Sequence, residues 1–360
     1  NGHISAASNA ALALAHGEFA ALLDHDDELH PEALHHVAAE IGAHRDALLI
    51  YTDEDKIAMF GRRSSAYLKP DYDPELLRGQ NCIAHLGVYR TEAVRALGGF
   101  RIGYEGAQDW DLALRLCEHA QPQQIRHVPR VLYHWRTLPS STSVALDRKD
   151  YASDAQQRML AEHLRRIGRP AQLFHPQDTV RWGHRPALPT PLPPVALAVE
   201  CPARPDASFV QWLGVIAARA RPLAAEVRVL VAPADEGALS ALLAHRPPSG
   251  VALRVFVRAA GASRAQALAD MLAARAGDVV VLLREAVLPA APDWLSNLLS
   301  WALLPEVGWV AAEVLDRTGA VRYAGTLALR DADGAPLLTQ PYRQAPAALA
   351  GYYDRLFLAH

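Results

Sequence analysis

The sequence contains little cysteine: Cys82, Cys117 and Cys201 are the only three, and they lie far apart. They form neither a metal-spaced pair nor a disulfide framework, so we expect a reducing compartment, the cytoplasm. No apolar run approaches the roughly 20 residues that span a bilayer. A secretory signal is also missing, and the chain opens on Asn1-Gly2-His3 without a methionine. We therefore expect a fragment of a longer cytoplasmic protein.

An excess of basic residues is missing as well. Lysine and arginine number 36 against 39 aspartates and glutamates, which gives a formal net charge of −3. A general nucleic-acid binder needs a basic surplus to neutralise phosphates, so we expect no nucleic-acid partner.

Proline is concentrated in the stretch "PALPTPLPP", residues 186–194. It predicts a stiff, extended linker between two domains, residues 1–185 and 195–360. In the first domain, predicted strands alternate with predicted helices, which favours a largely parallel α/β sheet with ligands at the carboxyl ends of its strands. We expect helices at 5–16, 31–42 and 109–119, and strands at 18–23, 47–56, 83–90 and 130–136.

The second domain contains an imperfect repeat of the first. Residues 263–289 match residues 5–31 in their order of helix, glycine, acidic residue and apolar strand. The residues after the strand do not match, because Arg284-Glu285-Ala286 stands where the first copy has acids. An arginine there would repel a metal, so we expect the second domain to be non-catalytic.

The strand predicted at 18–23 runs into Asp24-His25-Asp26-Asp27-Glu28. A solvated loop before a helix N-terminus would explain such acids. An EF-hand is excluded, because the sixth and twelfth positions counted from Asp24 are Leu29 and His35 instead of glycine and glutamate. A Mg²⁺ or Mn²⁺ site is the remaining alternative, since hard cations bind carboxylates and keep ligand phosphates in their shell.

A second acidic cluster, Asp53-Glu54-Asp55-Lys56, ends the next predicted strand. It is either a solvated loop or a contact to a donor or acceptor. The histidines of the first helices and their flanks show no spacing that points at one metal, so we interpret them as surface residues: His16, His30, His35 and His36.

Five segments carry a family resemblance, in this order: "GHISAASNAALALAHGEFAALLDHDDELHPEAL", "YTDEDKI", "LKPDYDPELLRGQNCIAHLGVYR", "GGFRIGYEGAQDWDLALRL" and "HVPRVLYHWR". Together they resemble family 2 glycosyltransferases of the GT-A fold, especially bacterial enzymes of O-antigen, rhamnan or capsular polysaccharide synthesis. The resemblance implies a Rossmann-like, mixed but mostly parallel sheet in two tandem copies, both incomplete. It also implies two further strands before Asn1.

The resemblance further implies a nucleotide-sugar donor and a lipid-linked or polysaccharide acceptor, with peripheral association at the inner membrane as an option. The D-x-D motif of the family corresponds to Asp24 and Asp26, which would bind Mn²⁺ or Mg²⁺. Asp26 would be the direct ligand, Asp24 would orient the ribose or the metal shell, and Asp27 would be a secondary ligand or structural. Asn9 would flank the nucleotide. In "YHWR", His134 would reach the metal or diphosphate, Trp135 would stack on a sugar, and Arg136 would pair with phosphate, before a loop (137–143) that could close.

Inverting transfer needs a base, and the resemblance assigns this role to Asp109 in "GAQDWD", where the family often has Glu-Asp. The alternative is that Asp109 caps its helix. Asp111 faces elsewhere on the helix and is the weaker candidate. Two other functions compete with the transferase: a non-catalytic glycan-binding or assembly module, and a metal-dependent hydrolase that needs no acceptor.

Overall fold

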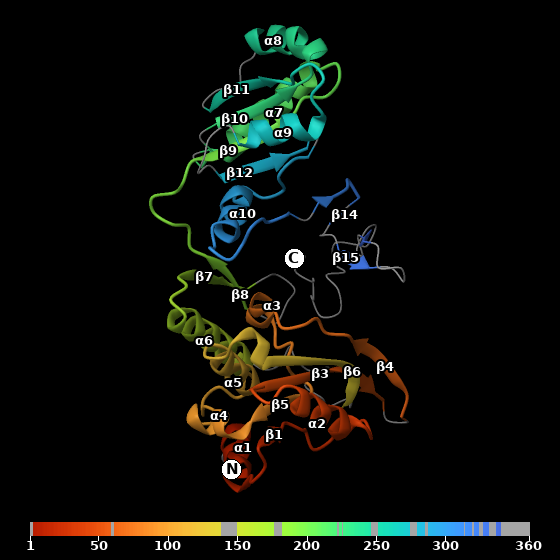
Figure 1. Cartoon of the computed structure of the whole chain (residues 1–360). Helices are drawn as coiled ribbons and strands as arrows, with labels where there is room; N and C mark the ends of the chain where they lie inside the picture. Colours follow the sequence, from red (N-terminus) through yellow and green to blue (C-terminus); the bar gives the residue numbers. More distant parts are fainter. Residues whose placement is uncertain are drawn as a thin grey trace. The chain divides into compact units, whose positions relative to one another are not determined.

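The chain forms two units, residues 1–187 and 188–346, in a computed structural model (Figure 1). We describe each unit by itself. The residues that the structure describes are 3–58, 61–137, 150–175, 182–221, 223–224, 226–245, 251–273, 279–284, 287–312, 314–318, 320–323, 327–330 and 336–339.

The first unit is built on a six-stranded sheet in the order β1-β5-β3-β6-β2, with β4 paired to β3. Strands β1 and β3 are both antiparallel to β5, and β6 is parallel to β3. The carboxyl ends of β1, β3 and β6 therefore point toward one edge of the sheet. The strands are β1 (Phe19–Ala21), β2 (Glu28–Leu29), β3 (Leu49–Ile57), β4 (Arg63–Tyr67), β5 (Gly87–Arg90) and β6 (Ile125–Arg136).

Helices cover both faces of this sheet, and the alternation of side chains along β3 shows how. Leu49 and Tyr51 belong to one core with residues of α3, α5 and α6, whereas Ile50 packs with residues of α2 on the opposite face. Both faces are buried, which explains the nearly continuous apolar start of β3. The helices are α1 (His3–Leu14), α2 (Ala33–Ala43), α3 (Pro74–Gly79), α4 (Thr91–Ala96), α5 (Gln108–Cys117) and α6 (Asp150–Arg166), and a short hairpin of β7 (Ala171–Phe174) and β8 (Gly183–Pro186) follows.

The predicted mixed α/β architecture is confirmed, with one correction. Each helix and strand expected in the first unit is present within a few residues of its predicted bounds, apart from the strand expected at 130–136, which already begins at Ile125. The predicted predominance of parallel pairs is wrong for this unit, because β3–β6 is parallel whereas β1–β5, β3–β5, β3–β4 and β2–β6 are antiparallel.

The second unit has a fully parallel four-stranded sheet in the order β11-β10-β9-β12. Helices α7 and α10 pack with one face and α9 with the other. A helix precedes a strand at α9–β12 as it does at α1–β1; the tandem duplication itself stays a prediction. The elements are β9 (Val195–Glu200), α7 (Ala207–Ala220), β10 (Glu226–Val231), α8 (Glu236–His245), β11 (Ala252–Val257), α9 (Arg264–Leu272), β12 (Val279–Leu283), α10 (Trp294–Ala302), β13 (Val314–Leu315), β14 (Val321–Tyr323), β15 (Leu327–Arg330) and β16 (Pro336–Thr339).

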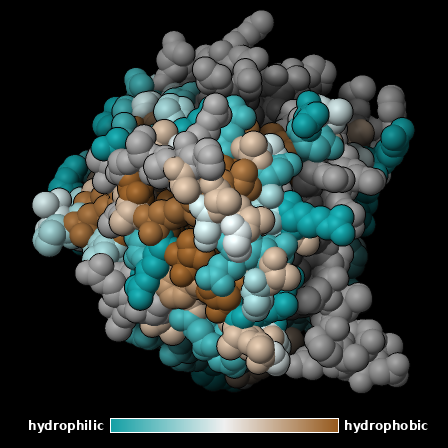
Figure 2. Space-filling view, turned by 90° about the horizontal axis from the view of Figure 1, so that it is seen from above, coloured by the Kyte–Doolittle hydropathy of each residue, from teal (hydrophilic) through white to brown (hydrophobic). Residues whose placement is uncertain are grey.

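Two strands of the four-stranded sheet lie at its edges and carry exposed apolar side chains. Val255 and Val257 are exposed on β11, and Leu282 is exposed on β12. Figure 2 shows one face of the molecule, on which apolar residues gather among hydrophilic ones. Leu188 and Leu192, from the proline-rich segment, pack against the core of the second unit. The described helices include none that is both long and apolar enough to cross a bilayer.

A buried charge cluster fixes the start of α5 in the first unit. Asp111 is fully buried, and its carboxylate accepts from Arg101 Nε at 3.0 Å and from Arg115 Nε at 2.8 Å. Arg115 also donates to the backbone oxygens of Leu97 (3.0 Å) and Gly99 (2.7 Å). The Asp111 carboxylate is thus engaged in this buried cluster, in keeping with its place as the weaker candidate for the base.

Replacing Asp111 by alanine is expected to destabilise the first unit by about 3–5 kcal/mol, because it leaves the buried Arg115 without its counter-charge. Hydrogen exchange of the α5 amides in urea would measure the loss. Asp46→Ala is the control, since Asp46 is exposed. Equal protection of α5 in both variants would show that the cluster contributes nothing.

Candidate active site

The acidic residues after β1 form a tight turn at the edge where β1, β3 and β6 end. The backbone N–H of Asp27 donates to the Asp24 carbonyl at 3.2 Å, which closes the turn. Asp24 is exposed, and the Asp26 side chain is 34% exposed. Both carboxylates are therefore open to a ligand, and we call residues 24–27 the acidic turn.

The inner side of the acidic turn is held by β6. Asp27 accepts from the Tyr133 hydroxyl and from the Arg136 backbone N–H, the latter at 2.7 Å. Burial raises the pKa of Asp27, although these two hydrogen bonds oppose the shift. The Arg136 Nε donates to the Asp26 carbonyl at 2.6 Å, and the guanidinium also binds the Glu28 carboxylate. A fixed cation thus offsets part of the repulsion between the acids.

Asp109 lies on the first turn of α5 and is partly buried, near enough to the acidic turn to feel the charge of Asp24. Asn81 Nδ2 donates to Asp109 Oδ2 at 2.8 Å, which orients the carboxylate. Burial raises the pKa of Asp109, and the charge of Asp24 adds to this shift while His85 opposes it. The N-cap of α5 is Ala107, so the alternative that Asp109 caps the helix is wrong. The carboxylate is left with the accepting capacity that a base requires.

The second acidic cluster corrects the expectation of a solvated loop. Asp53, Glu54 and Asp55 are only 3–5% exposed, because β3 continues between β4 and β6. Asp53 accepts from the Lys69 backbone N–H and lies 2.8 Å from His127 Nε2. These carboxylates are bonded to neighbouring side chains and backbone groups, so they are not free to bind a diffusing cation.

The side chains of two residues predicted to bind the metal or the nucleotide, His134 and Asn9, bond instead to other parts of the first unit. His134 is buried, and its Nδ1 lies 2.6 Å from Asp55 Oδ1, so this side chain belongs to the second acidic cluster. Asn9 Nδ2 donates to the Phe100 carbonyl at 2.8 Å, and Asn9 Oδ1 accepts from the Phe100 N–H at 2.8 Å. Gly99 (φ +72°) has no room for a Cβ beside Asn9, so Asn9 fixes a backbone turn.

The acidic turn fits a magnesium-type site better than a protein-only cage. Within the part of the chain that the structure describes, no group of three His, Cys, Asp or Glu side chains could hold a metal ion. Mg²⁺ usually takes one or two carboxylates and completes its shell with water and substrate phosphates. Asp24 and Asp26, exposed on one turn, match that arrangement. The loop expected to close over the site lies outside the described residues, apart from Thr137.

Reasoning from the sequence missed three contributors to the site. Tyr133 holds the acidic turn, Asn81 orients Asp109, and His85 acts on the pKa of both Asp27 and Asp109. For His85, the available signal was a polar residue within the otherwise apolar run "CIAHLGV".

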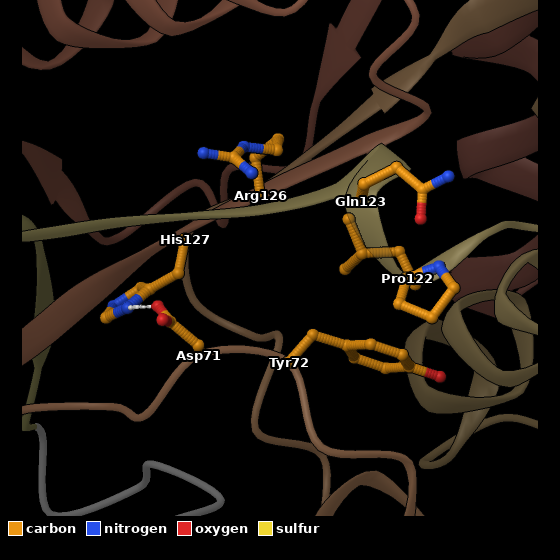
Figure 3. A pocket seen from close by; sticks show the side chains of 7 residues that line it. Asp71, Tyr72, Pro122, Gln123, Arg126 and His127 are labelled. Carbon is orange, nitrogen blue, oxygen red and sulfur yellow. Dashed lines mark hydrogen bonds and ion pairs between the residues drawn. The ribbon is translucent and has the colours of Figure 1, made fainter.

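A cavity of about 280 Å³ lies elsewhere in the first unit, at the amino end of β6 (Figure 3). His127 and Asp71 are joined on one side of it, and Tyr72 lies across from Arg126 and Gln123. Most of the length of β6 separates this cavity from the acidic turn at Arg136, and none of the predicted site residues lines it.

Comparison with known proteins identifies the family of the first unit. Residues 1–98 match the family described as glycosyl transferase family 2, and they include the acidic turn, Asn81 and His85. The first unit belongs to this family. The matched residues also contain β1, β3 and β5.

Two curated proteins and one solved structure are similar to this chain. The chain is 38% identical to uncharacterized protein y4gI of Sinorhizobium fredii, over 99% of the chain and 39% of that protein. It is 31% identical to the O-antigen biosynthesis protein RfbC of Myxococcus xanthus, over 91% of the chain and 25% of that protein. The S. aureus TarS structure with UDP is 21% identical, at a TM-score of 0.30, over 44% of this chain and 49% of that one. The chain thus spans about two fifths or less of the length of the Sinorhizobium fredii and Myxococcus xanthus proteins.

Proposed function

We propose that the protein transfers a sugar, with inversion, from a nucleotide-sugar donor to the acceptor glycan of a growing cell-surface polysaccharide. One observation carries this proposal: in a family 2 unit, the acidic turn at the end of β1 lies close enough to the partly buried Asp109 for the charge of Asp24 to raise the pKa of its carboxylate. The similarity to an O-antigen biosynthesis protein supports the choice of a polysaccharide acceptor.

The acidic turn would bind the diphosphate of the donor. Asp24 and Asp26 would hold Mn²⁺ or Mg²⁺, which supplies Lewis-acid stabilisation of the charge on the leaving diphosphate. Asp27 would stay bound to Tyr133 and Arg136 and keep the turn in place. Arg136 would reach a phosphate by exchanging its Glu28 contact for the ligand.

Asp109 would act as the general base. The acceptor hydroxyl oxygen attacks the anomeric carbon, the carbon–oxygen bond to the diphosphate breaks, and the diphosphate leaves with the electron pair. The hydroxyl proton passes to the Asp109 carboxylate, which Asn81 holds in orientation. Attack from the face opposite the leaving group inverts the anomeric centre.

The second unit would lack donor chemistry in this proposal. Arg284, exposed at the end of β12, follows the strand that the predicted repeat aligns with β1. Its neighbours Glu285 and Ala286 lie outside the described residues. Glu285→Gln is therefore expected to leave transfer unchanged.

A transfer assay separates this proposal from its competitors. The protein is incubated with Mn²⁺ and UDP-, GDP- or dTDP-sugars, with and without p-nitrophenyl glycosides as acceptors, and products are analysed by mass spectrometry and NMR. We expect acceptor-dependent product with inverted anomeric configuration. Equal release of free sugar with and without acceptor would indicate a hydrolase, and binding of glycoside without any turnover would indicate a glycan-binding module.

A further inference from the structure

His85 is linked to both the acidic turn and Asp109. It packs on Tyr133, whose hydroxyl donates to Asp27. The backbone N–H of the preceding residue, Ala84, donates to Asn81 Oδ1 at 3.4 Å, and Asn81 in turn donates to Asp109. The His85 imidazole stacks on the Tyr133 ring, with centroids 4.8 Å apart and planes 17° apart, and meets Trp135 edge-on at 5.6 Å. The residue is partly exposed. Two aromatic neighbours therefore fix the orientation of a side chain that a ligand can reach.

The backbone of His85 is held by a buried ion pair. The Lys69 side chain is fully buried, and its Nζ lies 3.3 Å from Glu54 Oε2. Lys69 Nζ donates to the His85 carbonyl at 2.6 Å, and Glu54 accepts from the His85 N–H. Because burying two charges is costly unless each is well bonded, this arrangement commits both of them to the backbone of one residue, His85.

The ring nitrogens of His85, unlike its backbone, are not held by hydrogen bonds from the described residues. Among the residues that the structure describes, none makes a hydrogen bond to Nδ1 or Nε2 of His85. A polar ring whose backbone is fixed so firmly, and whose nitrogens bond to nothing in the protein, is suited to donate to a bound molecule.

The position of the ring identifies that molecule. Through Tyr133 the ring is linked to the acidic turn, where the proposed diphosphate binds, and through Ala84 and Asn81 its backbone is linked to Asp109, where the acceptor hydroxyl would be deprotonated. The group between a diphosphate and an attacking hydroxyl is the transferred sugar. Resting on the proposed function, we propose that His85 is a substrate-binding residue that donates a hydrogen bond to a hydroxyl of the transferred sugar.

The decisive variant is His85→Phe, which keeps the stacking on Tyr133 and removes both nitrogens. Calorimetry with Mn²⁺ compares two ligands for each protein: UDP-glucose, or whichever of GDP-mannose and dTDP-rhamnose the wild type binds, and the matching nucleoside diphosphate. We expect the variant to bind the nucleotide sugar roughly tenfold more weakly, the loss of about one hydrogen bond. We expect its affinity for the nucleoside diphosphate to stay at the wild-type value.

Two controls make the result specific. His119→Phe changes an exposed histidine and is expected to leave both affinities unchanged. His85→Gln keeps a donor and is expected to recover part of the lost affinity. Equal affinities of wild type and His85→Phe for the nucleotide sugar, or an equal loss for both ligands, would overturn the assignment while leaving the proposed function intact. If wild-type protein binds no nucleotide sugar at all, the proposed function fails and the assignment fails with it.

Discussion

Asp109→Asn is expected to lower kcat by roughly 10²–10⁴-fold, the contribution of a positioned general base. The affinity for the nucleotide sugar should not change, because the variant removes the basic oxygen and keeps the size of the side chain. Its amide oxygen can still accept from Asn81, so the fold around α5 is preserved. Steady-state transfer kinetics and donor calorimetry on the same preparation measure the two quantities.

The pH profile of the wild type checks the same role. Burial raises the pKa of Asp109 above the ordinary aspartate value of 3.8. A base must be ionised, so kcat/KM should fall as the pH drops through this raised pKa, and the acid limb should disappear from the residual rate of Asp109→Asn. Asp154→Asn, at an exposed position on α6, is the control for fold and charge. An Asp109→Asn enzyme with wild-type kcat would show that the base lies elsewhere.

Asp26→Ala is expected to lower kcat/KM by about 10²–10³-fold, because Lewis-acid stabilisation of a leaving group contributes several kcal/mol. Unlike Asp109→Asn, this variant should also lose the Mn²⁺-dependent part of donor affinity. Transfer kinetics across a Mn²⁺ concentration series measure both effects.

The neighbour in the same turn supplies a matched control. His25 has a side chain that is 98% exposed, so His25→Ala alters the turn without removing a carboxylate. We expect wild-type metal dependence from it. If Asp26→Ala and His25→Ala show the same metal dependence, the acidic turn is a solvated loop.

Local patterns in the sequence indicated the acidic turn and Asp109 as site residues, and their roles stay predictions. The acidic turn could be recognised from the sequence because an apolar strand stops and four acids follow within five residues. A buried segment cannot accommodate so many carboxylates. Asp109 was legible through the motif in which it sits and because α5 is strongly amphipathic. The helix and strand order followed from the same periodicities.

Partners from distant segments determine the rest, and their approach could not be predicted. Asp53, Glu54 and Asp55 look like a hydrated loop until Lys69, His127 and His134 are brought beside them. The position of His85 depends on the same long-range packing. The antiparallel insertion of β5 between β1 and β3 likewise leaves no mark on local periodicity, since strand direction is set by the connections.

The central claim is that the acidic turn binds a nucleotide diphosphate through a divalent cation. Calorimetric titration of the wild-type protein with UDP-, GDP- and dTDP-sugars, in Mn²⁺ and again in EDTA, tests it most directly. The account predicts that one donor class binds in Mn²⁺ and that its binding is lost in EDTA. Binding of equal strength in both buffers would contradict it.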